Sequence, residues 1–139
     1  MRFIDTNLFL YKMLGKPKDK YRRSSALIER VEEGKERCAT SSIIIAEIVW
    51  VLETVNWKMS RIKELIEAIF ELKGLKILDT PGDFFPLDAV KLATKTGVDY
   101  VDALNSLTMQ KYKIREIYSF DRHFDRINFI TRLEPPLVE

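Results

Sequence analysis

Four carboxylates in this sequence could act together on one ligand: Asp5, Glu47, Asp102 and Asp121. Asp5 follows the apolar pair Phe3-Ile4, and Asp121 follows the segment 116–120, so each of the two aspartates is predicted to end a strand. Ligands of open α/β sheets bind beyond the carboxyl ends of the strands, which predicts that both aspartates face one ligand. The alternative is that each aspartate only caps the helix that follows it.

Glu47 lies inside the apolar segment 43–52, which predicts a helix that is mostly buried. A carboxylate there needs a cation, a hydrogen-bond partner or a proton, because burying its charge unpaired costs several kcal/mol. An internal ion pair, or a position on a narrow polar stripe, would also satisfy it. Asp99 and Asp102 form an i,i+3 pair on one side of a second predicted helix. A solvated helix face would show the same pattern, with Asp99 as no more than the N-cap.

Carboxylates that converge repel one another, and at neutral pH they cannot all stay ionised unless a cation neutralises them. Hard divalent cations prefer oxygen ligands, and Mg²⁺ takes one or two carboxylates. The sequence gives little support for a structural zinc site or a phosphate-binding loop. One cysteine and one histidine, Cys38 and His123, cannot build a structural zinc site. The five glycines are dispersed, so the sequence contains no glycine-rich phosphate loop.

The elements that must position these acids alternate along the chain. Hydrophobic periodicity and capping residues predict strands over 1–5, 37–39, 75–78 and 116–120, and helices over 6–14, 19–33, 42–55, 60–72, 83–96 and 99–112. This alternation indicates an α/β fold with a parallel sheet covered on both faces and right-handed crossovers. The tail after Phe129 carries Pro135 and Pro136 and is expected only to lie over the surface.

The composition excludes several classes of protein. The length of 139 residues, of which 46% are hydrophobic, predicts one compact domain over 1–139. The 23 Lys+Arg and 21 Asp+Glu nearly cancel, which excludes a disordered chain of high net charge and a generally basic coat for nucleic acids. Cys38 has no partner for an intramolecular disulfide, the N-terminus does not resemble a signal peptide, and no apolar stretch has the length of a membrane span. We therefore expect a soluble, cytoplasmic protein.

Several short motifs occur in an order and at spacings typical of one family. They are Phe3-Ile4-Asp5-Thr6-Asn7, Ala46-Glu47-Ile48, Asp102-Ala103-Leu104 and Ser119-Phe120-Asp121-Arg122-His123-Phe124-Asp125. This set, from Phe3 to about Leu133, resembles the PIN domain and is most similar to the VapC-like toxins of toxin–antitoxin pairs. The resemblance implies a three-layer α/β/α domain with a central parallel sheet. It also implies a ribonuclease that depends on Mg²⁺ or Mn²⁺ and hydrolyses RNA phosphodiester bonds.

Carried over position by position, the resemblance implies that the catalytic and metal-binding residues are Asp5, Glu47, Asp102 and Asp121. It implies supporting roles for Thr6, Asn7, Ser119, Asp99 and Asp125, of which Asp125 aligns with an acid present in only some members. Arg122 and Arg126 adjoin the inferred site and are predicted to contact RNA phosphates, whereas His123 is either a general acid or an ordinary solvated side chain. The segment Asn105-Ser106-Leu107 departs from the small, alanine-rich pattern of many relatives, which predicts altered packing or an altered edge of the site.

The resemblance further implies an RNA substrate, a VapB-like antitoxin and a homodimer, with no membrane partner. The apolar helices that contain Trp50 and residues 62–72 could form the surface for self-association or the antitoxin, although an ordinary core is the alternative. Two other functions stay open. One is a catalytically inactive PIN-like module that binds RNA or protein. The other is a phosphoaspartate enzyme with Asp5 as nucleophile, which is disfavoured because Asn7 stands where such enzymes need a second aspartate.

Overall fold

The computed structural model describes residues 1–80, 82 and 85–136. In this part of the chain, one parallel sheet has the strand order β3-β2-β1-β4-β5. The strands are β1 (Arg2–Ile4), β2 (Cys38–Ser41), β3 (Leu75–Leu78), β4 (Glu116–Tyr118) and β5 (Thr131–Leu133). The helices are α1 (Thr6–Leu14), α2 (Lys18–Glu32), α3 (Ser42–Thr54), α4 (Met59–Phe70), α5 (Phe85–Thr96) and α6 (Tyr100–Lys111), with a short 3-10 helix η1 (Arg122–Arg126). The predicted α/β class with a parallel sheet is confirmed.

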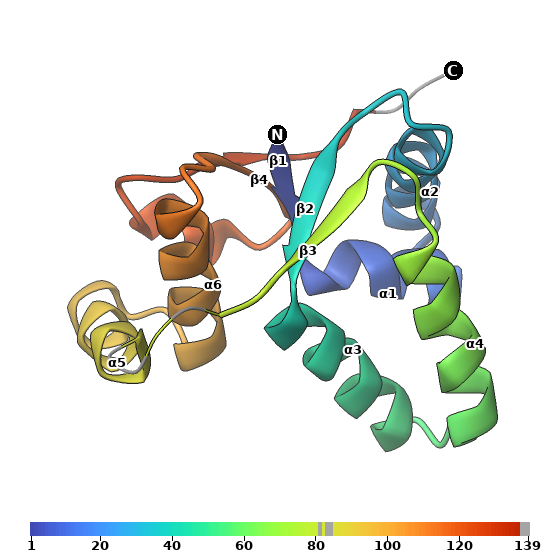
Figure 1. The fold of residues 1–139 in the computed structure, drawn as a ribbon, viewed down its shortest axis with the longest axis horizontal. Coiled ribbons are helices and arrows are strands. Elements are labelled where there is room, and N and C mark those ends of the chain that lie inside the picture. The colour runs from blue at the N-terminus through green and yellow to red at the C-terminus, as the bar shows by residue number, and fades with distance from the viewer. Residues whose placement is uncertain (81, 83–84, 137–139) are drawn as a thin grey trace.

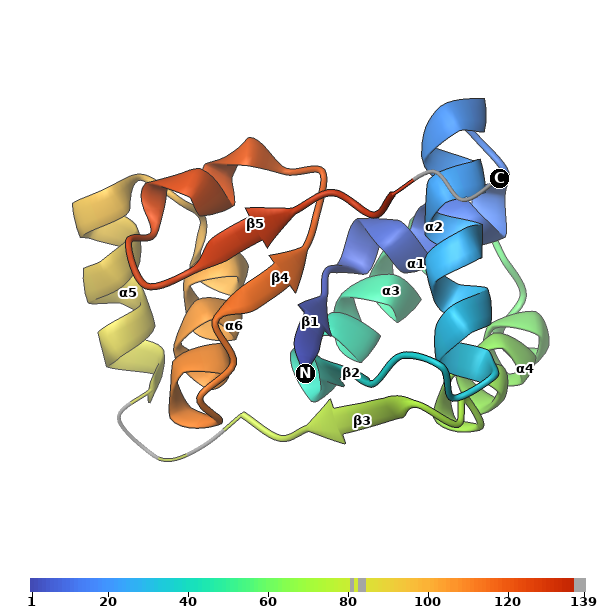
Figure 2. The ribbon, with the colours of Figure 1, turned by 90° about the horizontal axis from the view of Figure 1, so that it is seen from above.

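The order of the strands sets the two helical layers. The chain runs outward from β1 through β2 to β3, then crosses back to β4 and β5. Because crossovers between parallel strands are right-handed, α1 to α4 cover one face of the sheet, and α5, α6 and η1 cover the other (Figure 1). Figure 2 shows the same division from above, with α5 and α6 at one end of the molecule and α2 and α4 at the other. The strand order reverses between β1 and β4, the point at which open α/β sheets bind their ligands.

The centre of the sheet is apolar on both sides, as expected for a buried parallel sheet. In β1, Phe3 and Ile4 are fully buried, and Phe3 pairs with Ala39 of β2 and Ile117 of β4. Cys38 of β2 is also fully buried, and burial, followed by the charge of Glu36, raises the pKa of its thiol to about 12. These contacts fix the positions of the strand ends that carry the acidic residues.

Side-chain caps fix the starts of three helices near this edge of the sheet. Asp5 accepts a hydrogen bond from the backbone N–H of Thr6, Ser41 accepts one from Ile44, and Asp99 accepts one from Asp102. Each cap satisfies a backbone donor that the helix itself leaves unpaired. The predicted caps at Asp5 and Asp99 are therefore present, and Ser41 is the cap of α3.

The prediction for the tail is wrong at residues 131–133. These residues form β5, in which Thr131 pairs with Glu116 and Leu133 pairs with Tyr118. The prediction failed because Pro135 and Pro136 end the strand but do not prevent it, and three residues show no clear periodicity. The predicted strand over 116–120 ends at Tyr118, so Ser119 and Phe120 lead to Asp121. Residues 83–84 of the predicted helix over 83–96 lie outside the described residues, and α5 is described from Phe85.

The prediction that the helix around Glu47 is mostly buried holds only in part. In α3, Ile44, Ile48 and Leu52 pack into the core, whereas Ala46 is exposed and the Trp50 side chain is 65% exposed. Apolar residues therefore cover more of this helix than the core requires. Within the described residues, no helix has both the length and the apolar character needed to cross a bilayer.

Candidate active site

The four acids predicted from the sequence converge at the carboxyl edge of the sheet. The negative charges of Glu47 and Asp121 help to raise the pKa of Asp5, and the charges of Asp5, Asp121 and Glu47 help to raise the pKa of Asp102. The structure therefore brings side chains from α3, from α6 and from the residues that follow β1 and β4 within electrostatic range of one another. These acids lie far apart in the sequence, so the sheet and its crossovers create the cluster.

Asp5 is the most deeply buried member, with 6% of its surface exposed. Its Oδ1 accepts a hydrogen bond from Thr6 N at 2.8 Å, and its Oδ2 accepts one from Ser119 Oγ at 2.7 Å. Burial raises the pKa of Asp5 to about 6, the two hydrogen bonds oppose this shift, and the nearby charges of Glu47 and Asp121 add to it. Asp5 thus both caps α1 and belongs to the acid cluster, so the two roles weighed from the sequence coexist.

Ser119 links two of the acids through one hydroxyl group. Its Oγ donates to Asp5 Oδ2 and accepts a hydrogen bond from Asp121 N at 3.0 Å. The Ser119 side chain is fully buried, so water cannot replace either partner without rearrangement. Its predicted supporting role therefore has a geometric basis: Ser119 orients the Asp5 carboxylate and holds the backbone that carries Asp121.

We expect the Ser119→Ala variant to raise the pKa of Asp5 above its present value of about 6, because the variant removes a hydrogen bond to the ionised form. The free energy of unfolding should fall by about 1–3 kcal/mol, because a buried oxygen of Asp5 and the part-buried N–H of Asp121 lose their partner. Carboxyl NMR titration and urea unfolding measure the two effects. Ser60→Ala, at an exposed position of α4, is the matched control and should change stability by less than about 0.5 kcal/mol. An unchanged Asp5 titration would contradict the role given to Ser119.

One carboxylate oxygen of Asp102 lacks a hydrogen-bond partner among the described residues, which indicates that it binds a ligand. Its backbone N–H is held by Asp99 Oδ1 at 2.8 Å, which fixes the first turn of α6. Its Oδ2 is buried and has no hydrogen-bond partner among the described residues. Burial, followed by the charges of Asp99, Asp5, Asp121 and Glu47, raises the pKa of Asp102 to about 8. A buried carboxylate oxygen without a partner is costly unless a proton or a cation satisfies it.

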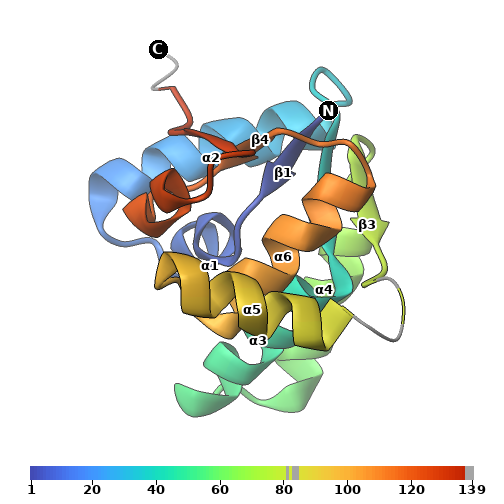
Figure 3. The same cartoon turned by 90° about the vertical axis from the view of Figure 1, so that its left-hand side faces the viewer.

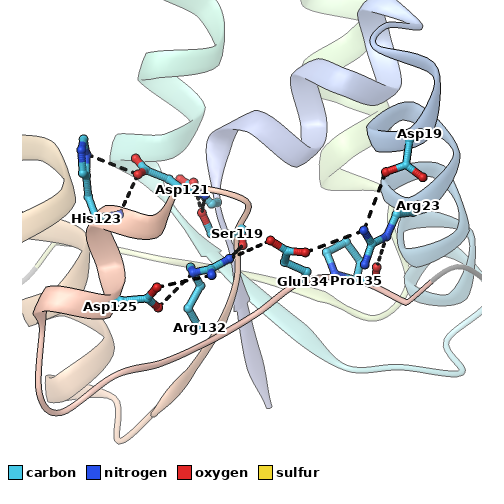
Figure 4. Close-up of polar contacts among 10 residues, drawn as sticks. Asp19, Arg23, Ser119, Asp121, His123, Asp125, Arg132, Glu134 and Pro135 are labelled. Atoms are coloured by element: carbon cyan, nitrogen blue, oxygen red, sulfur yellow. Dashed lines mark hydrogen bonds and ion pairs between the residues drawn. The ribbon is translucent and has the colours of Figure 1, made fainter.

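Asp102, Asp121 and His123 can each offer one ligand atom, and these atoms all lie within 4.8 Å of one another. Asp121 Oδ1 lies 3.3 Å from His123 Nδ1 and accepts a hydrogen bond from the backbone N–H of His123 at 2.9 Å (Figure 4). Three donors at this separation fit a divalent cation that prefers oxygen ligands and tolerates an imidazole. A ligand role for His123 was not predicted from the sequence; the residue lies here because Asp121 caps η1 two positions before it.

Glu47 is half-buried on α3. It takes part in none of the ion pairs formed by the described residues, so the internal salt bridge considered from the sequence is not found. Asn105 holds α3 against α6, because its buried Oδ1 accepts a hydrogen bond from Ser41 Oγ at 2.5 Å. Asn105, a departure from the family pattern, therefore takes part in the packing of α6 against the start of α3. It sets the position of the helix that carries Glu47 relative to the helix that carries Asp102.

The other predicted residues lie around this cluster. Thr6 is buried and binds Asp5 through its backbone, whereas Asn7 is exposed. Asp125 points to Arg132 rather than to the acids, with Arg132 Nε at 3.0 Å from Asp125 Oδ1 (Figure 4). Arg132 also donates to Ser119 O at 3.0 Å, so β5 supports the segment between Ser119 and Asp121. Arg122 and Arg126 are exposed on η1.

Comparison with known proteins places this arrangement in a family. A family model described as the PIN domain matches residues 2–130. The chain is 27% identical over 132 residues to a VapC ribonuclease of Aquifex aeolicus, covering 94% of this chain and 95% of that protein. It is 31% identical to Ribonuclease VapC2 of Methanocaldococcus jannaschii, covering 95% of this chain and 92% of that protein.

Solved structures have the same fold. Mycobacterium tuberculosis VapC20, described as a Sarcin-Ricin loop cleaving toxin, matches with a TM-score of 0.73 and 19% identity, covering 94% of this chain and 97% of that one. The Rickettsia felis VapBC2 complex with a promoter DNA fragment matches with a TM-score of 0.67 and 18% identity, covering 96% and 97%. The match of the family model over nearly the whole chain confirms the resemblance found in the sequence: this chain belongs to the PIN domain family.

Proposed function

We propose that the protein is a ribonuclease that hydrolyses RNA phosphodiester bonds with the aid of Mg²⁺ or Mn²⁺, and that it is the toxin of a VapBC-type pair. The observation that carries this proposal is the convergence of four carboxylates, one of which, Asp102, has a buried Oδ2 with no partner among the described residues. The names of the curated relatives, a VapC ribonuclease and Ribonuclease VapC2, supply the substrate class. We propose that residues 1–139 form a single PIN-like domain that acts in the cytoplasm.

The acids have different roles in the proposed site. Asp102 and Asp121, with His123, would hold the cation, and Asp5 and Glu47 would contribute negative charge beside it. A divalent cation bound there supplies Lewis-acid polarisation of the phosphate and offsets charge that develops in the transition state. Both oxygens of Asp5 already accept hydrogen bonds, so Asp5 is fixed as an electrostatic anchor. Glu47 forms none of the observed ion pairs and is half-buried, which suits it to accept the proton of an attacking water.

Metal titration of RNA cleavage tests this function. Purified full-length protein should leave a mixed-sequence single-stranded RNA intact in EDTA and should cleave it when Mg²⁺ or Mn²⁺ is added in excess of the chelator. Metal-independent RNA binding without cleavage at any concentration of either metal would instead support the inactive module. The phosphoaspartate alternative requires a beryllofluoride adduct on Asp5, whose two oxygens are already engaged.

We propose a VapB-like antitoxin and a second copy of this chain as protein partners. Complexes from Rickettsia felis and Salmonella typhimurium among the similar structures are described as VapBC. Large apolar side chains are exposed on α3 and α4, including Trp50 at 65% and Phe70 at 61%. Light scattering of the protein, alone and co-purified with a candidate antitoxin, measures both assemblies, and a monomer that binds no antitoxin would contradict the proposal.

A further inference from the structure

A concave surface lies on the face of the sheet covered by α5, α6 and η1. It consists of two adjoining pockets with volumes of about 730 Å³ and 440 Å³, which share Asn128 and Phe129 as lining residues. The first pocket is lined by the C-terminal part of α6 and the start of β5, and the second by the end of α5 and the end of η1. Figure 3 shows α5 and α6 side by side on this face. We call the combined surface the basic groove and define it by Lys95, Lys113, Arg115, Arg126 and Phe129.

The positive charges of the basic groove are not balanced by acidic residues in the described part of its lining. Lys113 and Arg115 line the first pocket, Lys95 and Arg126 line the second, and no acidic residue lines either one within the described residues. The whole chain has 21 acidic residues against 23 basic ones, so this segregation is local. None of the four cations takes part in the ion pairs formed by the described residues. Their charge is therefore available to an anionic ligand.

An aromatic side chain lies between the two pairs of cations. Phe129 lines both pockets and remains partly exposed, and the exposed amide of Asn128 lies beside it. Cations that follow a backbone, combined with an aromatic platform for bases, are the features with which proteins bind single-stranded nucleic acids. An acidic protein segment would use the cations but would gain little from the aromatic face.

The basic groove starts at the end of η1, the short helix that Asp121 caps, and leads away from it. Arg126 is the last residue of η1, the helix that Asp121 caps, and its Nη1 donates to Gly97 O at 3.3 Å, just before the cap of α6. From there the chain crosses to Thr131, which pairs with Glu116 at the first position of β4. Because β4 ends at the edge that carries the acids, the groove connects that edge with the opposite one.

We propose that the basic groove binds a single-stranded stretch of the RNA whose scissile bond lies at the acid cluster, with phosphates on Lys95, Arg126, Lys113 and Arg115 and a base stacked on Phe129. The inference rests on the proposed ribonuclease function for its choice of ligand. It adds a binding surface outside the acid cluster that lengthens the region of the substrate held by the protein.

Binding without cleavage tests the groove separately from catalysis. Fluorescence anisotropy of a labelled, unstructured RNA of about 20 nucleotides, measured in EDTA, reports affinity over a range of salt concentrations. We expect the Lys113→Gln/Arg115→Gln variant to bind roughly tenfold more weakly and its salt slope to fall by about 1.4, because each phosphate that is no longer neutralised lowers the slope by about 0.7. The matched control is Lys63→Gln/Lys76→Gln, which removes the same charge from exposed positions of α4 and β3. This control should bind like the wild type.

Phe129→Leu keeps an apolar side chain in a position that packs against the core, so it tests stacking without removing the packing. We expect it to weaken RNA binding roughly fivefold or more with an unchanged salt slope. Equal loss of affinity in the groove variant and its control would overturn the proposal, even if the wild type cleaves RNA. A polyglutamate peptide that binds as tightly as RNA, with no effect of Phe129→Leu, would overturn it in favour of an acidic protein ligand. Groove-dependent RNA binding without any metal-dependent cleavage would support the groove and contradict the nuclease.

Discussion

The Asp102→Asn variant should lose RNA cleavage by roughly a hundredfold to a thousandfold, the range seen when one electrostatic contact to a transition state is removed. The reason lies in the buried Oδ2, which has no partner among the described residues and is the oxygen best placed to meet a cation. An amide nitrogen or a neutral carbonyl at this position provides no negative charge. Initial rates at saturating Mg²⁺ or Mn²⁺ measure the loss.

The same variant should be at least as stable as the wild type when metal is absent. In the folded protein, burial and neighbouring acids raise the pKa of Asp102 to about 8, so its ionised form is unfavourable at neutral pH. Asparagine removes that penalty. Asp88→Asn, at an exposed position in the first turn of α5, makes the same change of charge and should leave cleavage within about twofold of the wild type. If Asp102→Asn unfolded at lower urea than Asp88→Asn, or cleaved RNA at the wild-type rate, the assigned site would be wrong.

The stability of the metal-free protein should fall as the pH rises from about 4 to about 8. The carboxyl groups of Asp5 and Asp102 have raised pKa values in the folded state, about 6 and about 8, against 3.8 for the ordinary carboxyl group. Between these values the folded chain binds more protons than the unfolded chain, so the free energy of unfolding decreases with pH. For Asp5 alone, the shift corresponds to roughly 3 kcal/mol, fully present below about pH 4 and lost above about pH 6.

Urea unfolding in EDTA at about pH 5.5 and pH 8.5 measures this slope. Excess Mg²⁺ or Mn²⁺ should reduce it, because a cation that binds only the folded state stabilises the protein most where the carboxylates are ionised. The Asp5→Asn/Asp102→Asn variant is the internal control, since it lacks both groups and should show a much smaller slope without metal. Equal slopes in this variant and the wild type would mean that other groups control the pH dependence.

Local features of the sequence were enough to predict most of the framework. Asp5 after an apolar pair identified both the end of β1 and the cap of α1, and the alternation of strands and helices predicted a parallel sheet. The positions of Asp5, Glu47, Asp102 and Asp121 in the sequence suggested that they act on one ligand, and the family resemblance then assigned all four to one catalytic site. β5 could not be predicted from residues 131–133 alone, because its stability comes from pairing with β4 and from the contacts of Arg132.

The details that complete the candidate site depend on distance in space rather than on spacing in the sequence. His123 is the only histidine of the chain, and the sequence does not show that its ring lies beside Asp121. That contact depends on the position of η1. Asn105 was recognised as a departure from the family pattern, but its bond to Ser41 spans 64 residues. The partial exposure of α3 was missed because its apolar residues exceed what the core takes up. Each of these features requires the packing of at least two elements to be known.

The burial of Cys38 has a practical consequence for every binding experiment described above. A thiol with no exposed surface and a pKa of about 12 carries almost no thiolate at neutral pH and is out of reach of maleimide and iodoacetamide dyes. A cysteine introduced on the surface, for instance at Lys63, would therefore take a fluorophore alone, without any need to remove the native thiol. Conversely, Cys38 could react only when the sheet opens, so the rate at which a thiol reagent labels it would measure the rate of that opening.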